Sequence, residues 1–261
     1  KTATADGPQS GFHLVLIAAN NTGLKNLMKL SSLGFIEGFY YKPRIDKELL
    51  EKYSEGLFAL TACLQGEIPW LLLQDRWDEA KQVARWFLER FGPERFFIEL
   101  QNHGIDEELA VLPKLITLAR EMGIKLVATN DGHYINREDA DFHDKLLCIQ
   151  TDKTVDEPNR MRFHNDQFYL KSPQEMKELF AEVPEAVANT MWIAERTDVE
   201  IELGRMKLPK FPVPEGFSSV DEYIEVKAWE GLHRRYPKIT KKIEDRFRHE
   251  MEIIKEMGFS G

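Results

Sequence analysis

The sequence predicts an α/β fold in which short buried strands alternate with amphipathic helices. Apolar runs rich in β-branched and aromatic residues recur about every 30 residues, the length of one strand–helix unit. The stretches between these runs carry apolar residues at helical spacing. The polar residues of most chemical interest stand mostly where apolar runs end, and strand ends are where α/β proteins build their sites.

Four strands are predicted in the first half of the chain, over Phe12–Ala19, Leu57–Cys63, Arg95–Gln101 and Lys125–Thr129. Three helices accompany them, over Gly23–Ser32, Arg76–Phe91 and Glu107–Met122. We expect Thr22 to cap the first helix, and Pro113 to interrupt or restart the third. Regular alternation of this kind favours βα units around a parallel sheet or barrel.

After Tyr134 the pattern changes to helices separated by polar loops. Helices are predicted over Asp139–Ile149, from Ser172 onward with a capping box, and over Val187–Arg196, and a short strand is predicted over Gln167–Leu170. Leu208–Gly216 holds three prolines and is typical of a stiff connector. Amphipathic helices follow over Val220–Tyr236 and Ile239–Met257. We therefore expect one domain over residues 1–207, and a connector with the start of another region over residues 208–261.

Composition limits the function classes. Of the 261 residues, 43% are hydrophobic and 30% are charged, which is typical of a globular chain with a sizeable core. The net charge of −9 disfavours this piece as a major grip on nucleic acid, but it leaves room for an acidic metal site. The two cysteines favour a reducing cytoplasm over a disulfide framework. Neither a membrane span nor a signal peptide is evident, and because both ends look cut we expect a piece of a longer protein.

The segment Leu126–Tyr134 is the strongest indication of chemistry, because a buried apolar run ends in Asn, Asp, Gly and His. Side chains two apart on an extended backbone point the same way, so Asp131 and His133 are expected to project together. Gly132 between them adds no bulk and lets the backbone turn closely. A neighbouring oxygen and nitrogen ligand suit a zinc-type ion, although the same triplet is also common in plain turns.

His13 and Cys63 are the two further candidate ligands, and both belong to predicted strands. Taken singly, His13 is better explained as a core histidine and Cys63 as inert packing, so the prediction depends on their joint occurrence at one edge. His13 is the exception to the strand-end rule, because it lies near the start of its strand. His103 and Asn130 also follow strands, and we place them at the possible rim of the site.

A family resemblance covers nearly the whole chain. It is carried, in order, by FHLVLIA, EGFYYKPRID, LTACLQGEIP, FFIELQNHG, ATNDGHY, FYLKSPQEM, LPKFPVPEG and EMGFSG. On these stretches the chain resembles the N-terminal PHP (polymerase and histidinol phosphatase) domain of bacterial DNA polymerase III alpha subunits. The resemblance implies part of a distorted (β/α)7 barrel with a trinuclear metal centre, followed by a Pro-rich connector and helices leading toward the polymerase domain.

The resemblance also implies a ligand set and partners. It places metal ligands at His13, Cys63, Asp131 and His133, with Zn²⁺ or Mn²⁺ as the ion, and the family's other ligands upstream of Lys1. For the parent protein it implies DNA-directed DNA synthesis in the cytoplasm, with Mg²⁺ in the polymerase domain, DNA and dNTPs as substrates, and replisome partners such as the sliding clamp. No membrane partner is expected. Because a partial ligand set binds weakly, we expect the fragment alone to be inactive.

Three functions remain open at this stage. The PHP domain is a metal-dependent 3′→5′ exonuclease or phosphoesterase, an inert scaffold beside the polymerase, or a freestanding phosphoesterase like histidinol phosphatase. A self-contained barrel has no use for the connector and the two helices after it, so the third reading is disfavoured. An intact HxH motif upstream would favour catalysis over scaffolding.

Overall fold

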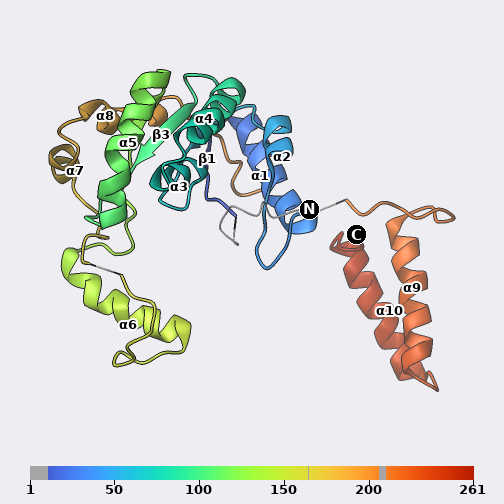
Figure 1. Ribbon diagram of the computed structural model, residues 1–261. Coiled ribbons are helices and arrows are strands. Elements are labelled where there is room, and N and C mark those ends of the chain that lie inside the picture. Colours follow the sequence, from blue (N-terminus) through green and yellow to red (C-terminus); the bar gives the residue numbers. More distant parts are fainter. Residues whose placement is uncertain (1–10, 164, 206–209) are drawn as a thin grey trace. The chain divides into compact units, whose positions relative to one another are not determined.

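The computed structural model describes residues 11–163, 165–205 and 210–261 (Figure 1). Two compact units are present, Lys1–Glu200 and Ile201–Gly261, and each is described by itself. The domain boundary predicted at residues 207 and 208 falls outside the described residues. Among the described residues, no helix combines the length and the apolar character needed to cross a membrane.

The first unit is built on one four-stranded sheet, which confirms the α/β class. Its strands are β1 (Val15–Ala18), β2 (Leu57–Leu60), β3 (Phe96–Leu100) and β4 (Lys125–Ala128), in the spatial order β1-β2-β3-β4. The last three strands are parallel, as predicted. The parallel expectation was wrong for β1, which pairs antiparallel to β2 with Val15 opposite Leu60. The Ala19 N–H, directly after β1, donates to the Gly56 carbonyl, directly before β2, at 2.8 Å, so the connection begins and ends at the same end of the sheet.

Eight α-helices and one 3₁₀ turn are described in the first unit. They are α1 (Asn21–Ile36), α2 (Lys47–Lys52), α3 (Glu67–Leu73), α4 (Trp77–Phe91), α5 (Asp106–Met122), the 3₁₀ turn η1 (Arg137–Asp139), α6 (Ala140–Thr151), α7 (Pro173–Leu179) and α8 (Pro184–Ala194). The capping prediction for α1 was wrong, because Asn20 is the N-cap and its side chain accepts from the Gly23 N–H at 3.0 Å. α5 continues through Pro113 without interruption.

The predicted strand over Gln167–Leu170 is also corrected. This segment makes only an isolated bridge, between Tyr134 and Tyr169, because the segment opposite it is a loop rather than a strand. The capping box at Ser172 is confirmed, with Glu175 as its second member.

Side chains of the sheet alternate between two apolar layers. One face carries Ala59, Phe96 and Ile98 into the main core, which α1 to α5 fill from their buried sides, and Figure 1 shows α3, α4 and α5 around β3. Phe87 of α4 stacks on Phe96 with ring centroids 5.2 Å apart. The other face carries Phe58, Leu60, Phe97 and Val127 toward Trp192 and Ile193 of α8. Both faces of the sheet are therefore covered, and its site must lie at an end of the strands.

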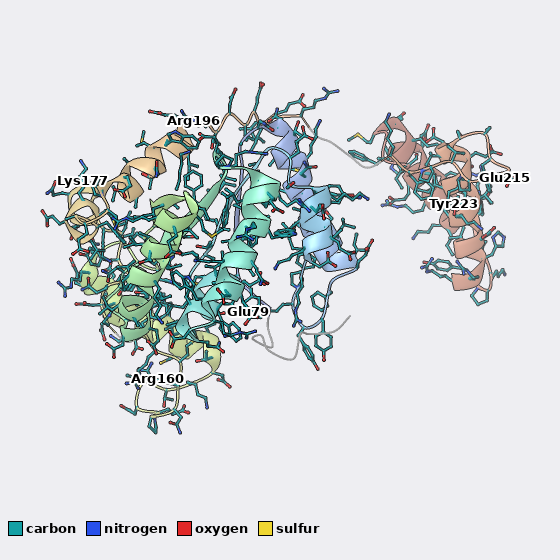
Figure 2. All side chains as sticks on the ribbon, turned by 45° about the horizontal axis from the view of Figure 1, so that its top comes forward. Glu79, Arg160, Lys177, Arg196, Glu215 and Tyr223 are labelled. Carbon is teal, nitrogen blue, oxygen red and sulfur yellow. The ribbon has the colours of Figure 1, made fainter. Side chains whose placement is uncertain are left out.

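The second unit contains the two helices predicted at the end of the chain, α9 (Val220–Arg235) and α10 (Lys241–Glu256). Trp229 packs on Phe247 with ring centroids 4.4 Å apart, which joins the apolar faces of the two helices. Tyr223, labelled in Figure 2, contacts Phe211 and Phe217 of the preceding segment. Part of the predicted connector therefore packs on α9, while its first residues, 208 and 209, lie outside the described residues.

Candidate metal centre

All four predicted ligands lie at one edge of the sheet. Cys63 follows β2, and Asp131 and His133 follow β4, which is parallel to β2 and β3. His13 precedes β1, and because β1 is antiparallel to β2 its beginning lies beside the end of β2. The His13 N–H donates to the Gln65 carbonyl at 3.0 Å and fixes this arrangement. The antiparallel strand therefore explains why a histidine at the start of a strand shares an edge with residues at strand ends.

His13 and Cys63 form the first donor pair, with His13 Nδ1 3.5 Å from Cys63 Sγ. Burial raises the pKa of the Cys63 thiol, and the negative charges of Asp131 and Glu99 raise it further, against backbone hydrogen bonds that lower it. Asp131 is thus close enough to Cys63 to act on it electrostatically. A divalent cation in this position would relieve the repulsion and favour the thiolate.

Asp131 and His133 form the second donor pair, with Asp131 Oδ1 3.3 Å from His133 Nε2. Both side chains are exposed, and the His133 N–H is held by the Phe168 carbonyl at 2.8 Å. Gly132 does not need its special backbone freedom here, because its φ is not positive and an added Cβ would meet its nearest neighbour at 3.6 Å. The Gly132 N–H donates to the Asn130 carbonyl at 2.9 Å, so the two donors lie side by side on a tight turn beyond the end of β4 that does not require a glycine.

The donors stand as two pairs rather than as one closed cluster. Within residues 11–163, 165–205 and 210–261, no three His, Cys, Asp or Glu side chains lie close enough to surround one ion. The donor chemistry nevertheless fits a metal, because a thiol, two imidazoles and a carboxylate are the ligands that zinc prefers. The residues present therefore suit one side of a metal centre.

A buried glutamate beneath the donors escaped the sequence reasoning. Glu99 of β3 is 4% exposed, and burial raises the pKa of its carboxyl. Its carboxylate accepts from the Ala62 N–H at 2.9 Å and from the Thr129 hydroxyl at 2.5 Å. The one available signal was a single acidic residue inside the apolar run FFIEL, where a charge is costly unless it is hydrogen-bonded.

The two predicted rim residues have structural partners. His103 is 2% exposed, its Nδ1 lies 2.9 Å from Glu108 Oε1, and its ring stacks on Phe168 at 4.4 Å. The structure thus places His103 in the interior rather than among the exposed donors. Asn130 donates to the Tyr169 carbonyl at 2.8 Å and so ties the Asp131 loop to the following segment.

Comparison with known proteins shows which family and which relatives this chain resembles. The PHP domain family matches residues 3–103. The matched residues make up less than half of the chain. The matched part of it includes His13 and Cys63, whereas Asp131 and His133 lie beyond it.

This chain is similar to three curated proteins that share one name. It is 47% identical to the DNA polymerase III subunit alpha of Treponema pallidum over 250 residues, which are 96% of this chain and 21% of that protein. It is 46% identical to the subunit of the same name from Borreliella burgdorferi, over 96% of this chain and 22% of that protein. The Thermus aquaticus subunit is 46% identical over 87% of this chain. The chain spans about a fifth of the length of these curated relatives.

Proposed function

We propose that this chain is part of a bacterial DNA polymerase III alpha subunit, and that its PHP domain hydrolyses phosphodiester bonds as a metal-dependent 3′→5′ exonuclease. His13, Cys63, Asp131 and His133 are the proposed ligands, and Zn²⁺ or Mn²⁺ is the proposed ion. The observation that carries the proposal is the placement of both donor pairs at one edge of the sheet. The relatives' shared name supports the assignment to a polymerase subunit.

The rest of the parent protein belongs to the same proposal. Residues 1–207 are the later portion of a distorted (β/α)7 PHP barrel, and residues 208–261 are the connector and the start of the polymerase region. DNA synthesis from dNTPs, with Mg²⁺ in the polymerase domain, is the activity of the whole subunit. Its setting is the cytoplasm, and its partners include DNA and replisome subunits such as the sliding clamp.

The chemistry follows from the donor types. A bound divalent cation supplies Lewis-acid polarisation of a phosphate ester and a water of lowered pKa. Cys63 and His13 would hold the ion from beside the first two strands, while Asp131 would contribute negative charge that balances it. His133, next to Asp131, would be the fourth ligand. The proposed ligands include no Lys or Arg side chain to bind DNA phosphates, so substrate affinity has to come from the cation and from other parts of the subunit.

A scaffolding PHP domain is the second candidate function. It is favoured by the absence, among the described residues, of three donors at metal-binding spacing. A freestanding histidinol-phosphatase-like enzyme fits less well, because α9 and α10 form a second unit with its own apolar contacts.

Asp131→Ala in the full-length subunit separates these functions. We expect the variant to lose bound zinc and 3′→5′ exonuclease activity while nucleotide incorporation is retained. Asp141→Ala is the matched control, because Asp141 is an exposed aspartate of α6 whose ion pair with Lys145 lies within one helix. Metal content that is unchanged in Asp131→Ala would reject the ligand assignment. Loss of metal from a subunit whose wild type shows no exonuclease activity would establish the scaffold instead.

A further inference from the structure

One buried carboxylate joins the two strand ends that lead to Cys63 and Asp131. Glu99 lies on β3, between β2 and β4. One carboxylate oxygen accepts from the Ala62 N–H, next to Cys63, and the other accepts from the Thr129 hydroxyl, two residues before Asp131. The Glu99 N–H also donates to Thr61 Oγ1 at 2.9 Å. A single side chain thus links the Ala62 backbone to the Thr129 hydroxyl, on the two sides of the candidate centre.

On the Cys63 side, the hydrogen bond to Glu99 holds Ala62 in an unusual backbone conformation. Ala62 has a φ of +61°, a left-handed conformation that residues with a Cβ rarely adopt. Its N–H points inward to Glu99 Oε2 at 2.9 Å, and Ala62 itself is 6% exposed. Without that acceptor the buried N–H would be unpaired, and Ala62 would be free to relax toward a common conformation. Cys63 would then turn with it, away from His13.

The tether on the Asp131 side continues as a short chain of hydrogen bonds. Thr129 donates to Glu99 Oε1 and accepts from Gln101 Nε2 at 3.2 Å. Thr129 follows β4 directly and leads into the Asn130–His133 loop. Its hydroxyl therefore fixes the position of the start of that loop relative to β3.

From this bridge we infer that Glu99 is a positioning residue of the metal centre, which sets the spacing of Cys63 and Asp131 without contacting the ion. The inference rests on the proposed metal centre. Partners that orient metal ligands in this way commonly change metal affinity by about 10- to 100-fold when they are removed. A purely structural carboxylate would change stability alone.

Glu108 offers a matched control for stability. It is also a buried glutamate, 5% exposed, and it also accepts two hydrogen bonds, from the His103 N–H and from the His103 ring. Its hydrogen-bond partner, His103, is adjacent in sequence to neither Cys63 nor Asp131. Removal of either carboxylate leaves buried donors unpaired, so both variants should lose stability, but only the loss of Glu99 should disturb the donors.

The test is protection of Cys63 from alkylation by zinc in the intact polypeptide, with the modified peptide read by mass spectrometry. Cys148 is 5% exposed and serves as the internal reference. We expect Glu99→Ala to raise the zinc concentration for half-protection by about 10- to 100-fold. Glu99→Gln, which keeps an acceptor for Ala62, should recover most of the affinity. Glu108→Ala should stay within about threefold of wild type, well below such an effect.

Each outcome of this experiment tests either the positioning role of Glu99 or the metal centre itself. Half-protection that is unchanged in Glu99→Ala, or raised equally in Glu108→Ala, overturns the positioning role. Absence of zinc protection in the wild type overturns the metal centre itself and the inference with it. If Glu99→Ala fails to fold, Thr129→Val removes one tether with little change of shape, and an unchanged half-protection in that variant overturns the role as well.

Discussion

Replacing Gly66 by alanine tests the packing of the loop that carries Cys63. Gly66 closes this loop and is the N-cap of α3, with φ −68° and ψ 152°. Its N–H donates to the Cys63 carbonyl at 2.8 Å. An added Cβ would lie 2.0 Å from the Thr61 carbonyl oxygen and 3.1 Å from the Cys63 carbonyl oxygen. The chain uses glycine here because another part of its backbone comes too close for a side chain.

The size of the effect follows from this contact. Real Cβ contacts essentially never fall below 3.0 Å, so a gap of 2.0 Å must open by about 1 Å. Thr61 cannot move away easily, because it is 4% exposed and its hydroxyl accepts a hydrogen bond from the Glu99 N–H. Overpacking of this kind costs about 1–3 kcal/mol, and alanine at an N-cap costs about 1 kcal/mol more than glycine. We therefore expect Gly66→Ala to lower the free energy of unfolding by about 2–4 kcal/mol.

Thermal unfolding followed by circular dichroism measures this cost, and the midpoint should fall by about 5–15 °C. Gly132→Ala is the matched control, because it alters the other donor loop at a glycine whose Cβ has room. Its midpoint should match wild type, with a stability change of less than about 0.5 kcal/mol. Equal midpoints for Gly66→Ala and wild type would refute the close-approach argument.

Three further outcomes are expected. In metal-free protein, Asp131→Asn should lower the pKa of the Cys63 thiol, because it removes a negative charge that raises it; the pH profile of Cys63 alkylation should shift to lower pH. Phe97→Ala should cost about 3–5 kcal/mol in urea unfolding, since Phe97 is 0% exposed and packs on Trp192. Arg160, labelled in Figure 2, lowers the pKa of Asp144 below 3.8 through a two-pronged ion pair. Its stabilisation should be present above pH 3.8 and lost as the pH falls through the lower folded value, so Arg160→Met should flatten the acid limb of the stability profile.

Elements with one strong local signal were predictable from the sequence. The Arg76–Phe91 prediction differs from α4 by one residue, because Ala80, Ala84, Phe87 and Phe91 form one buried stripe and Gly92 ends the helix. The strand over Arg95–Gln101 differs from β3 by one residue at each end. In both cases the burial that decides the structure is visible as a period in the chain itself.

Features set by distant partners were not predictable. α3 buries Ile68, Pro69, Leu71 and Leu72 together, so it shows little of the apolar and polar alternation that identifies a helix. The direction of β1 is fixed by its pairing with β2 and by the contact of Ala19 with Gly56, which lie far apart in the sequence.

The candidate site also has parts that the sequence led us to expect and parts that it did not. The proximity of Asp131 and His133 was expected from strand periodicity, but β4 ends at Ala128 and a tight turn, in which the Gly132 N–H donates to the Asn130 carbonyl, brings the two side chains together. The contact of His13 with Cys63 needed the antiparallel pairing, which no local pattern encodes. Glu99 was missed because its hydrogen-bond partners, Ala62 and Thr129, lie on two other strand ends.

The most direct test of the metal centre is anomalous diffraction at the zinc absorption edge from crystals of the intact polypeptide. The account predicts a zinc peak about 2.3 Å from Cys63 Sγ, with imidazole or carboxylate ligands from His13, Asp131 and His133 at about 2.0–2.2 Å. Zinc bound elsewhere in the protein, with this edge of the sheet bare of anomalous density, would contradict it.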